Sequence, residues 1–292
     1  MPTVIIDFNI DDTRGSIEAL LERLRRKAPG IGITEDVELD LRRCQFLGPS
    51  AVVTLIGLQA KATEHAHQLT LLPPAHPQLL NYCRYSGLLN AFSAGPPPDQ
   101  HAANVTTPIR QFHTRPLSEI EEVARLVRLQ MGMTSSDENR LTLTLIELAQ
   151  NVIDHSQSVV GGFLSARAYS NEREVRFAVA DMGVGFREAL SKTHAISRDL
   201  DAVRLAMTPN VSSRSSSHNL GQGLKLLRDI ILENGGSLLL LSKGAWYELR
   251  GAREHYGVLL SGNEYPGTMA AVRLPLRPAT ERDEEPHADI WG

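Results

Sequence analysis

The sequence has very little cysteine, lacks a long apolar run and shows no excess of basic residues. Only Cys44 and Cys83 occur among its 292 residues, which fits a reducing cytoplasm and gives no framework of several disulfides. No apolar stretch approaches the about 18 residues of a membrane span, and no signal-peptide pattern is present, so we expect a cytoplasmic protein. The net charge of −4 gives no general basic field that would attract nucleic acid.

The phosphate-binding pattern GxxxxGK followed by Ser or Thr is also absent, which argues against a Walker-type NTPase. The sequence instead contains three short segments, ELAQN, DMGVG and GQGL, in that order. Their polar and glycine positions are Glu147, Asn151, Asp181, Gly183, Gly185, Gly221 and Gly223. Each segment alone is a weak signal. Their order, with each segment on the expected helix or strand, predicts a nucleotide pocket.

The first segment lies in a predicted helix that covers residues 134–156. Glu147 and Asn151 are four residues apart, so they share one face of this helix among apolar neighbours. The amide oxygen of an asparagine suits Mg²⁺, which prefers oxygen ligands. A nearby glutamate can orient a water molecule or take a proton from an incoming hydroxyl. We therefore predict Asn151 as a metal ligand and Glu147 as a catalytic base.

The other two segments supply a carboxylate and four glycines. Asp181 ends the predicted strand VRFAVAD, where its carboxylate could accept a hydrogen bond from the amino group of adenine. Gly183 and Gly185 allow positive φ and a close approach of the backbone to a base. Gly221 and Gly223 precede a predicted helix, whose first N–H groups can face phosphate.

With these motifs, the stretch from Pro116 to Pro278 resembles the GHKL (histidine kinase-like) ATPases, which include the anti-sigma-factor serine kinases. ELAQN is similar to the family's N box, DMGVG and GQGL to its two glycine boxes, and PGTMAAVRLPL to its closing strand. The resemblance implies an α/β sandwich that holds ATP between helices and sheet. It also implies Asn151 as the Mg²⁺ ligand, Asp181 as the adenine-binding residue, Glu147 as the base, and Thr268 near the adenine.

Residues 1–93 alternate predicted strands and helices, which is typical of a small α/β domain. The segments VELDLRRCQFLGPSAVVTLIGL and YSGLLNAF resemble the STAS domain of anti-anti-sigma factors. Regulated members of that family carry Asp-Ser at the start of the helix and are phosphorylated on the serine. Gly48 and Pro49 occupy these positions here, so that site is lost. We expect the adjacent Ser50 to be a polar group at the helix start rather than a phosphoacceptor.

The predicted organisation is therefore two domains. Residues 1–93 form a STAS-like interaction domain, 94–115 a Pro-rich linker, 116–278 a GHKL ATP-binding domain and 279–292 an acidic tail. Within the linker, three consecutive prolines cannot continue a helix, and residues 105–112 can form a strand. Residues 186–220 are expected to form a lid, because the serine-rich run SSRSSSHN is too polar to pack.

Three further side chains could approach the phosphates. Arg214 in the lid and Lys225 beyond the glycine pair are the best-placed cations. His155 follows Asn151 by four residues. It could lie near phosphate, or it could simply interact with carbonyl groups at the helix end.

The expected function is that of a regulatory protein that binds ATP and Mg²⁺ and acts as an ATPase or a protein serine/threonine kinase of the anti-sigma class. A regulatory protein of STAS or sigma-factor type is the expected partner, and a homodimer is an open alternative. The competing hypothesis is a non-catalytic binding module in which ATP only selects a partner. A histidine kinase is disfavoured, because too few residues separate His113 from Asn151 for a dimerising helical hairpin.

Overall fold

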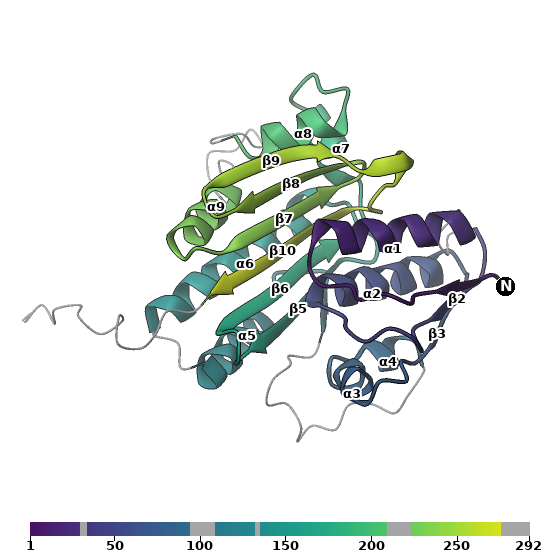
Figure 1. Cartoon of the computed structure of the whole chain (residues 1–292). Helices are drawn as coiled ribbons and strands as arrows, with labels where there is room; N and C mark the ends of the chain where they lie inside the picture. The colour runs from purple at the N-terminus through teal and green to yellow at the C-terminus, as the bar shows by residue number, and fades with distance from the viewer. Residues whose placement is uncertain (30–33, 94–108, 132–134, 209–222, 276–292) are drawn as a thin grey trace, which may run out of the picture.

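The computed structural model describes residues 1–29, 34–93, 109–131, 135–208 and 223–275, and these form a mixed α/β structure (Figure 1). Two sheets are present in this part of the chain, one parallel and one antiparallel. The α/β class expected from the sequence is therefore confirmed. Among the described residues, no helix is both long enough and apolar enough to cross a membrane.

The N-terminal half contains the parallel sheet, whose strand order is β1-β2-β3. Its elements are β1 (Thr3–Ile5), α1 (Arg14–Lys27), β2 (Val37–Asp40), α2 (Pro49–Glu64), β3 (Leu69–Leu72), α3 (Pro77–Tyr85) and α4 (Leu88–Ala91). This alternation of strands and helices agrees with the pattern expected from the sequence.

The C-terminal half contains a seven-stranded antiparallel sheet, whose strand order is β4-β5-β6-β10-β7-β8-β9. The strands are β4 (Arg110–Phe112), β5 (Gly162–Tyr169), β6 (Glu174–Asp181), β7 (Ser237–Ser242), β8 (Ala245–Arg250), β9 (Arg253–Val258) and β10 (Thr268–Pro275). The helices are α5 (Leu117–Met131), α6 (Ser135–His155), α7 (Gly185–Ser191), α8 (Asp199–Ala206) and α9 (Gly223–Glu233), with a short 3₁₀ turn, η1 (Leu260–Gly262).

Alternating side chains of the large sheet face two different layers. On one face, Leu164, Phe177 and Leu240 pack in a hydrophobic core with residues of α5, α6 and α9. On the other face, Phe163 and Met269 belong to the core of the N-terminal half. Both faces are thus covered, as the period-two alternation of a strand requires when each face is buried.

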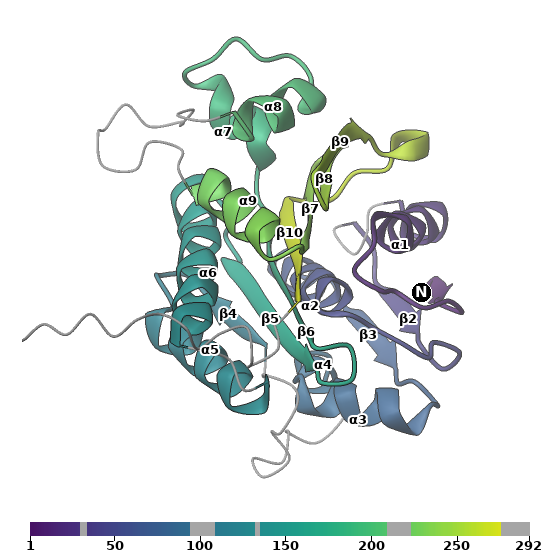
Figure 2. The ribbon, with the colours of Figure 1, turned by 60° about the vertical axis from the view of Figure 1, so that its left-hand side comes forward.

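Helix α2 fills the space between the two sheets, as Figures 1 and 2 show from two directions. It contacts β5, β6 and β10 on one side and β3 on the other. Every residue of its first part, from Pro49 to Leu58, is buried. A helix that is apolar on all sides is stable only when it is enclosed, so α2 acts as a shared core for both halves.

A second contact between the halves involves α1. The Arg25 side chain donates a hydrogen bond of 3.0 Å to the side-chain oxygen of Asn263. The carboxylate of Glu18 accepts the backbone N–H of Leu260. The Arg14 guanidinium lies 4.6 Å from the centre of the Trp246 ring. Helix α1 therefore holds the connection between β9 and β10.

The part of the expected lid that the structure describes is folded. Residues 185–191 form α7 and residues 199–206 form α8, which packs against β8 and β9. Ala202 and Val203 are fully buried, and Val203 belongs to the same core as α6 and α9. The apolar face of α8 therefore packs this part of the expected lid against the rest of the C-terminal half. The serine-rich run of the expected lid lies outside the described residues.

Candidate functional site

A pocket opens between the end of α6, the central strands β6, β10 and β7 of the large sheet, and the start of α9. It encloses about 440 Å³ of space, part of which is open to solvent. Its lining consists of Leu148, Asn151, Val152, His155, Ser156, Val179, Asp181, Gly185, Phe186, Ala189, Leu224, Leu240, Thr268 and Ala270. Mostly apolar walls with a few polar groups are typical of a small-molecule site.

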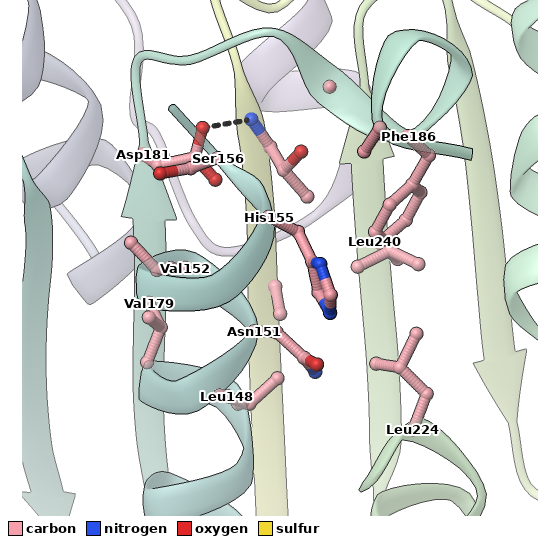
Figure 3. Close-up of a pocket in the computed structure, with 14 residues that line it drawn as sticks. Leu148, Asn151, Val152, His155, Ser156, Val179, Asp181, Phe186, Leu224 and Leu240 are labelled. Carbon is pink, nitrogen blue, oxygen red and sulfur yellow. Dashed lines mark hydrogen bonds between the residues drawn. The ribbon is translucent and has the colours of Figure 1, made fainter. Parts of the chain in front are cut away.

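Asp181 lies at the inner end of this pocket, where β6 ends. Its side chain is almost fully buried. One carboxylate oxygen, Oδ1, accepts the N–H of Gly183 at 2.8 Å. It also accepts the N–H of Thr268 at 3.3 Å, and Figure 3 draws this second bond as a dashed line. Within the described part of the chain, no donor is found for the other oxygen, Oδ2. That oxygen is therefore available to a ligand that carries a hydrogen-bond donor.

Burial controls the charge of this carboxylate. Loss of solvent raises the pKa of Asp181 from 3.8 to about 6, and the two N–H groups together with Lys243 and Lys61 oppose this rise. The carboxylate is consequently ionised at neutral pH, but at a cost in free energy. An ionisable group that lies in a pocket and has a strongly shifted pKa is typical of functional sites.

The glycines after Asp181 are required by close packing. A Cβ atom on Gly183 would lie 1.9 Å from the carbonyl oxygen of Ser156, which accepts the N–H of Val184 at 2.8 Å. Gly185 has a φ of 77°, and its Cβ would lie 2.8 Å from the side chain of Lys243. Any other residue at Gly183 would push the end of α6 away from the strand end, and with it one wall of the pocket.

Helix α6 supplies the second wall. Leu148, Asn151 and His155 recur at helical spacing and all line the pocket. Figure 3 shows the Asn151 amide pointing into the open space. No described residue forms a hydrogen bond with that amide, so its oxygen can bind a ligand. His155 is the last residue of α6, and it both ends the helix and lines the pocket.

Glu147 lies one helical turn before Asn151 and is partly exposed. It is not part of the pocket lining. Its carboxylate has no hydrogen bond or ion pair with another described residue. The structure thus leaves Glu147 beside the pocket, free to act on a group that projects from it.

Helix α9 brings its start to the pocket. It begins at Gly223, and Leu224 lines the pocket. The ion pair of Arg140 with Glu233, at 3.2 Å, joins the start of α6 to the end of α9, so the two helices run antiparallel. The first N–H groups of α9 therefore lie near the C-terminal end of α6. Lys225 is exposed on this first turn, whereas Gly221 and Arg214 lie outside the described residues.

Thr268 begins β10, where it pairs with Asp181 on one side and Ser242 on the other. The Ser242 hydroxyl accepts the N–H of Phe186 at 2.8 Å and lies 3.5 Å from the Thr268 hydroxyl. The sequence motifs do not predict that Ser242, Phe186 and Lys243 lie at or beside the site. Their places depend on the register of β7 and β10, for which the sequence carries no local signal.

Asn151, Asp181, Gly185 and Thr268, four of the residues singled out in the sequence, line one pocket, with Gly183 directly adjacent. The described residues contain no group of three or more His, Cys, Asp or Glu that could hold a metal ion. Comparison with known protein families finds no matching family model, and no curated protein shows significant similarity to the chain.

Proposed function

We propose that this chain is an ATP- and Mg²⁺-binding regulatory protein with a GHKL-type nucleotide domain and a STAS-like N-terminal domain. The observation that carries the proposal is the meeting of Asn151, Asp181 and the start of α9 around one pocket. These groups come from three separate segments of the chain. Asn151 offers an amide, Asp181 a carboxylate and the start of α9 backbone N–H groups. A bound nucleotide would use all three.

The adenine would bind at the Asp181 end. The free oxygen of this carboxylate would accept a hydrogen bond from the exocyclic amino group of the base. Val179, Leu240 and Ala270 provide apolar walls for the ring, and burial of such a ring is favourable. An ionised acceptor disfavours guanine, which presents a carbonyl oxygen at the corresponding position. The site would therefore select adenine.

The phosphates would extend toward Asn151 and α9. The N–H groups at the start of a helix, together with its dipole, favour an anion. Asn151 fits a Mg²⁺ ion bound to the phosphates, because its amide has no partner among the described residues and faces the pocket. Such an ion keeps most of its ligands as water and phosphate oxygens and would neutralise phosphate charge. A cluster of protein carboxylates is not required.

Glu147 would act as the general base for transfer of the γ-phosphoryl group. Its carboxylate would take the proton of a serine or threonine hydroxyl on a partner protein, or of a water molecule. The oxygen of that group then bonds to the γ-phosphorus as the bond to the bridging oxygen breaks, and ADP leaves. Transfer to a partner makes the protein a kinase, and transfer to water makes it an ATPase.

The phosphoacceptor would belong to another protein, because the N-terminal half offers no accessible hydroxyl at the start of α2. Ser50 is fully buried between the two sheets. A regulatory protein of STAS or sigma-factor type remains the proposed partner. In this chain the N-terminal half would serve as a fixed layer under the ATP-binding sheet.

Calorimetry of wild-type protein with ATP and Mg²⁺ tests the proposal. Binding of ATP in preference to GTP, with loss of binding in Asp181→Asn, supports it. Absence of ATP binding would overturn it. Incubation with γ-labelled ATP, alone and with candidate partner proteins, then follows the label into protein or free phosphate and separates kinase from ATPase.

A second candidate is a non-catalytic module in which ATP binding only selects a partner. The position of Glu147 outside the pocket lining favours this alternative. It predicts ATP binding of the same selectivity, with no labelled protein and no released phosphate.

A further inference from the structure

Lys243 occupies the turn between β7 and β8, on the outer side of the base-binding end of the pocket. Its φ is 50°, a left-handed conformation that residues other than glycine rarely adopt. The side chain is partly buried, and it lies against Gly185, where an added Cβ would be 2.8 Å from the Lys243 Cγ atom. A strained lysine that points into the interior needs an explanation beyond solubility.

The ammonium group joins two segments that are far apart in sequence. It donates a hydrogen bond of 2.7 Å to the carbonyl of Gly183 and one of 3.0 Å to the carbonyl of Pro266. The first carbonyl lies two residues after Asp181, and the second lies two residues before Thr268. Since the Thr268 N–H donates to Asp181, Lys243 closes a ring of hydrogen bonds around the carboxylate.

The backbone of Lys243 reinforces this contact. Its N–H donates to the carbonyl of Gly267 at 3.2 Å, and its carbonyl accepts the N–H of Tyr265 at 3.0 Å. The Tyr265 hydroxyl in turn lies 3.2 Å from the hydroxyl of Thr54 on α2. The segment before β10 is thus held from the turn and from the N-terminal half at once.

We propose that Lys243 is a positioning residue for base recognition, which fixes the Asp181 carboxylate and the Thr268 edge in the geometry that binds adenine. The proposal rests on the proposed function and adds to it a residue that does not touch the nucleotide. Lys243 acts through the Gly183 and Pro266 carbonyls. It also places a positive charge near Asp181, which favours the ionised form of that carboxylate.

Several charged or titratable groups surround Asp181. Lys243 approaches from the β7–β8 turn, Lys61 from α2, and Tyr265 from the segment before β10. His155 of α6 lines the same pocket. Both lysines lower the pKa of Asp181, but only Lys243 has hydrogen bonds to the Gly183 and Pro266 carbonyls. This difference provides a matched control.

The test compares Lys243→Met, Lys243→Arg and Lys61→Met with wild type by ATP calorimetry between pH 5.5 and 8.5, in steps of roughly half a pH unit across the Asp181 titration. We expect Lys243→Met to weaken ATP binding at least about ten-fold at pH 8, because two charge-assisted hydrogen bonds are lost. Lys61→Met should stay within about two-fold at that pH. Lys243→Arg should restore most of the affinity, because a guanidinium can reach both carbonyls.

The pH profile separates the effect of a lysine charge, which both lysines share, from the positioning effect at pH 8, which is expected of Lys243 alone. Loss of either lysine charge should move the acid limb of ATP binding to higher pH, since the pKa of Asp181 then rises further. Titration of the nucleotide itself is common to all the proteins and cancels in the comparison. If Lys243→Met does not fold, Lys243→Gln replaces it in each measurement.

A second readout requires no nucleotide. Hydrogen exchange of the Gly183 and Thr268 amides should accelerate in Lys243→Met and remain unchanged in Lys61→Met. If wild type binds ATP, while Lys243→Met binds equally well with unchanged amide exchange, the positioning role is refuted. If wild type does not bind ATP, the proposed function fails. Amide exchange then decides separately whether Lys243 holds the two segments together.

Discussion

The Ser50 hydroxyl donates a hydrogen bond of 2.6 Å to the Asp12 carboxylate in the interior between the two sheets. The same oxygen of Asp12 accepts the Ser50 N–H at 2.8 Å. Asp12 thereby supplies the acceptor at the start of α2 that Gly48, which lacks a side chain, cannot provide. A Cβ atom on Gly48 would lie 2.4 Å from Asp12. The start of α2 is thus built around the carboxylate of Asp12, which comes from a loop distant in sequence. The Ser50 hydroxyl is engaged in the hydrogen bond to this carboxylate.

Ser50→Asp should therefore destabilise the fold strongly. A second carboxylate would be buried beside Asp12, whose pKa burial already raises. An uncompensated buried charge costs about 3–5 kcal/mol. Ser50→Ala removes only hydrogen bonds and should cost about 1–2 kcal/mol. Urea unfolding of both variants measures the difference. A Ser50→Asp protein as stable as wild type would contradict the buried position of this hydroxyl.

Asp181→Asn should abolish ATP binding and yet stabilise the folded protein above pH 7. Asparagine can still accept the Gly183 and Thr268 N–H groups, but its amide nitrogen would face the adenine amino group. The substitution also removes the cost of a buried charge. Because the pKa of Asp181 rises from 3.8 to about 6 on folding, that cost at neutral pH is roughly 3 kcal/mol.

The sign of this effect sets its pH dependence. The folded state binds the Asp181 proton more tightly than the unfolded state. Protonated Asp181 therefore contributes its full stabilisation of the folded state below about pH 4. This stabilisation is lost as the pH rises through about 6 and the buried group ionises. Asp181→Asn should exceed wild type in melting temperature at pH 8, and the two should converge at pH 4. Equal melting temperatures at pH 8 would show that the carboxylate is not buried as described.

Gly183→Ala should damage the pocket, whereas Gly15→Ala should leave it intact. The added methyl group at Gly183 meets the Ser156 carbonyl, which is backbone and cannot rotate away. We expect a loss of at least about 2 kcal/mol in the free energy of unfolding and of measurable ATP binding. At Gly15, exposed in α1, a methyl group meets no atom within 4 Å. Alanine at this position should raise the free energy of unfolding by about 0.5 kcal/mol, because alanine has a higher helix propensity than glycine. Chemical denaturation and ATP calorimetry on both variants provide the comparison.

The sequence predicted the elements with a strong local pattern. Helix α6 and strand β6 lie where the sequence predicts a helix over residues 134–156 and a strand that ends at Asp181. It did not predict that α2 is enclosed between two sheets, because an apolar run is equally compatible with burial on one side only. Lys243 and Lys61 approach Asp181 through contacts between residues 60 or more positions apart. Such contacts depend on strand order and helix placement, which local patterns do not encode.

Glu147→Ala separates catalysis from simple ATP binding. As the general base, Glu147 would act at the γ-phosphate and not at the adenine. Its removal should leave ATP affinity within a few-fold and reduce turnover by roughly 10²–10⁴, the usual contribution of a positioned acid–base group. Phosphate release and label transfer to partner proteins measure turnover, and calorimetry measures affinity.

Glu138→Ala is the matched control for this prediction. Glu138 lies on the same helix and pairs with Arg128 at 2.7 Å on the surface, away from the pocket. Its loss should change neither affinity nor turnover, because exposed ion pairs contribute little. If Glu147→Ala and Glu138→Ala both turn over ATP like wild type, Glu147 is not the base. If wild type itself shows no turnover with any partner while still binding ATP, the binding module is the correct function.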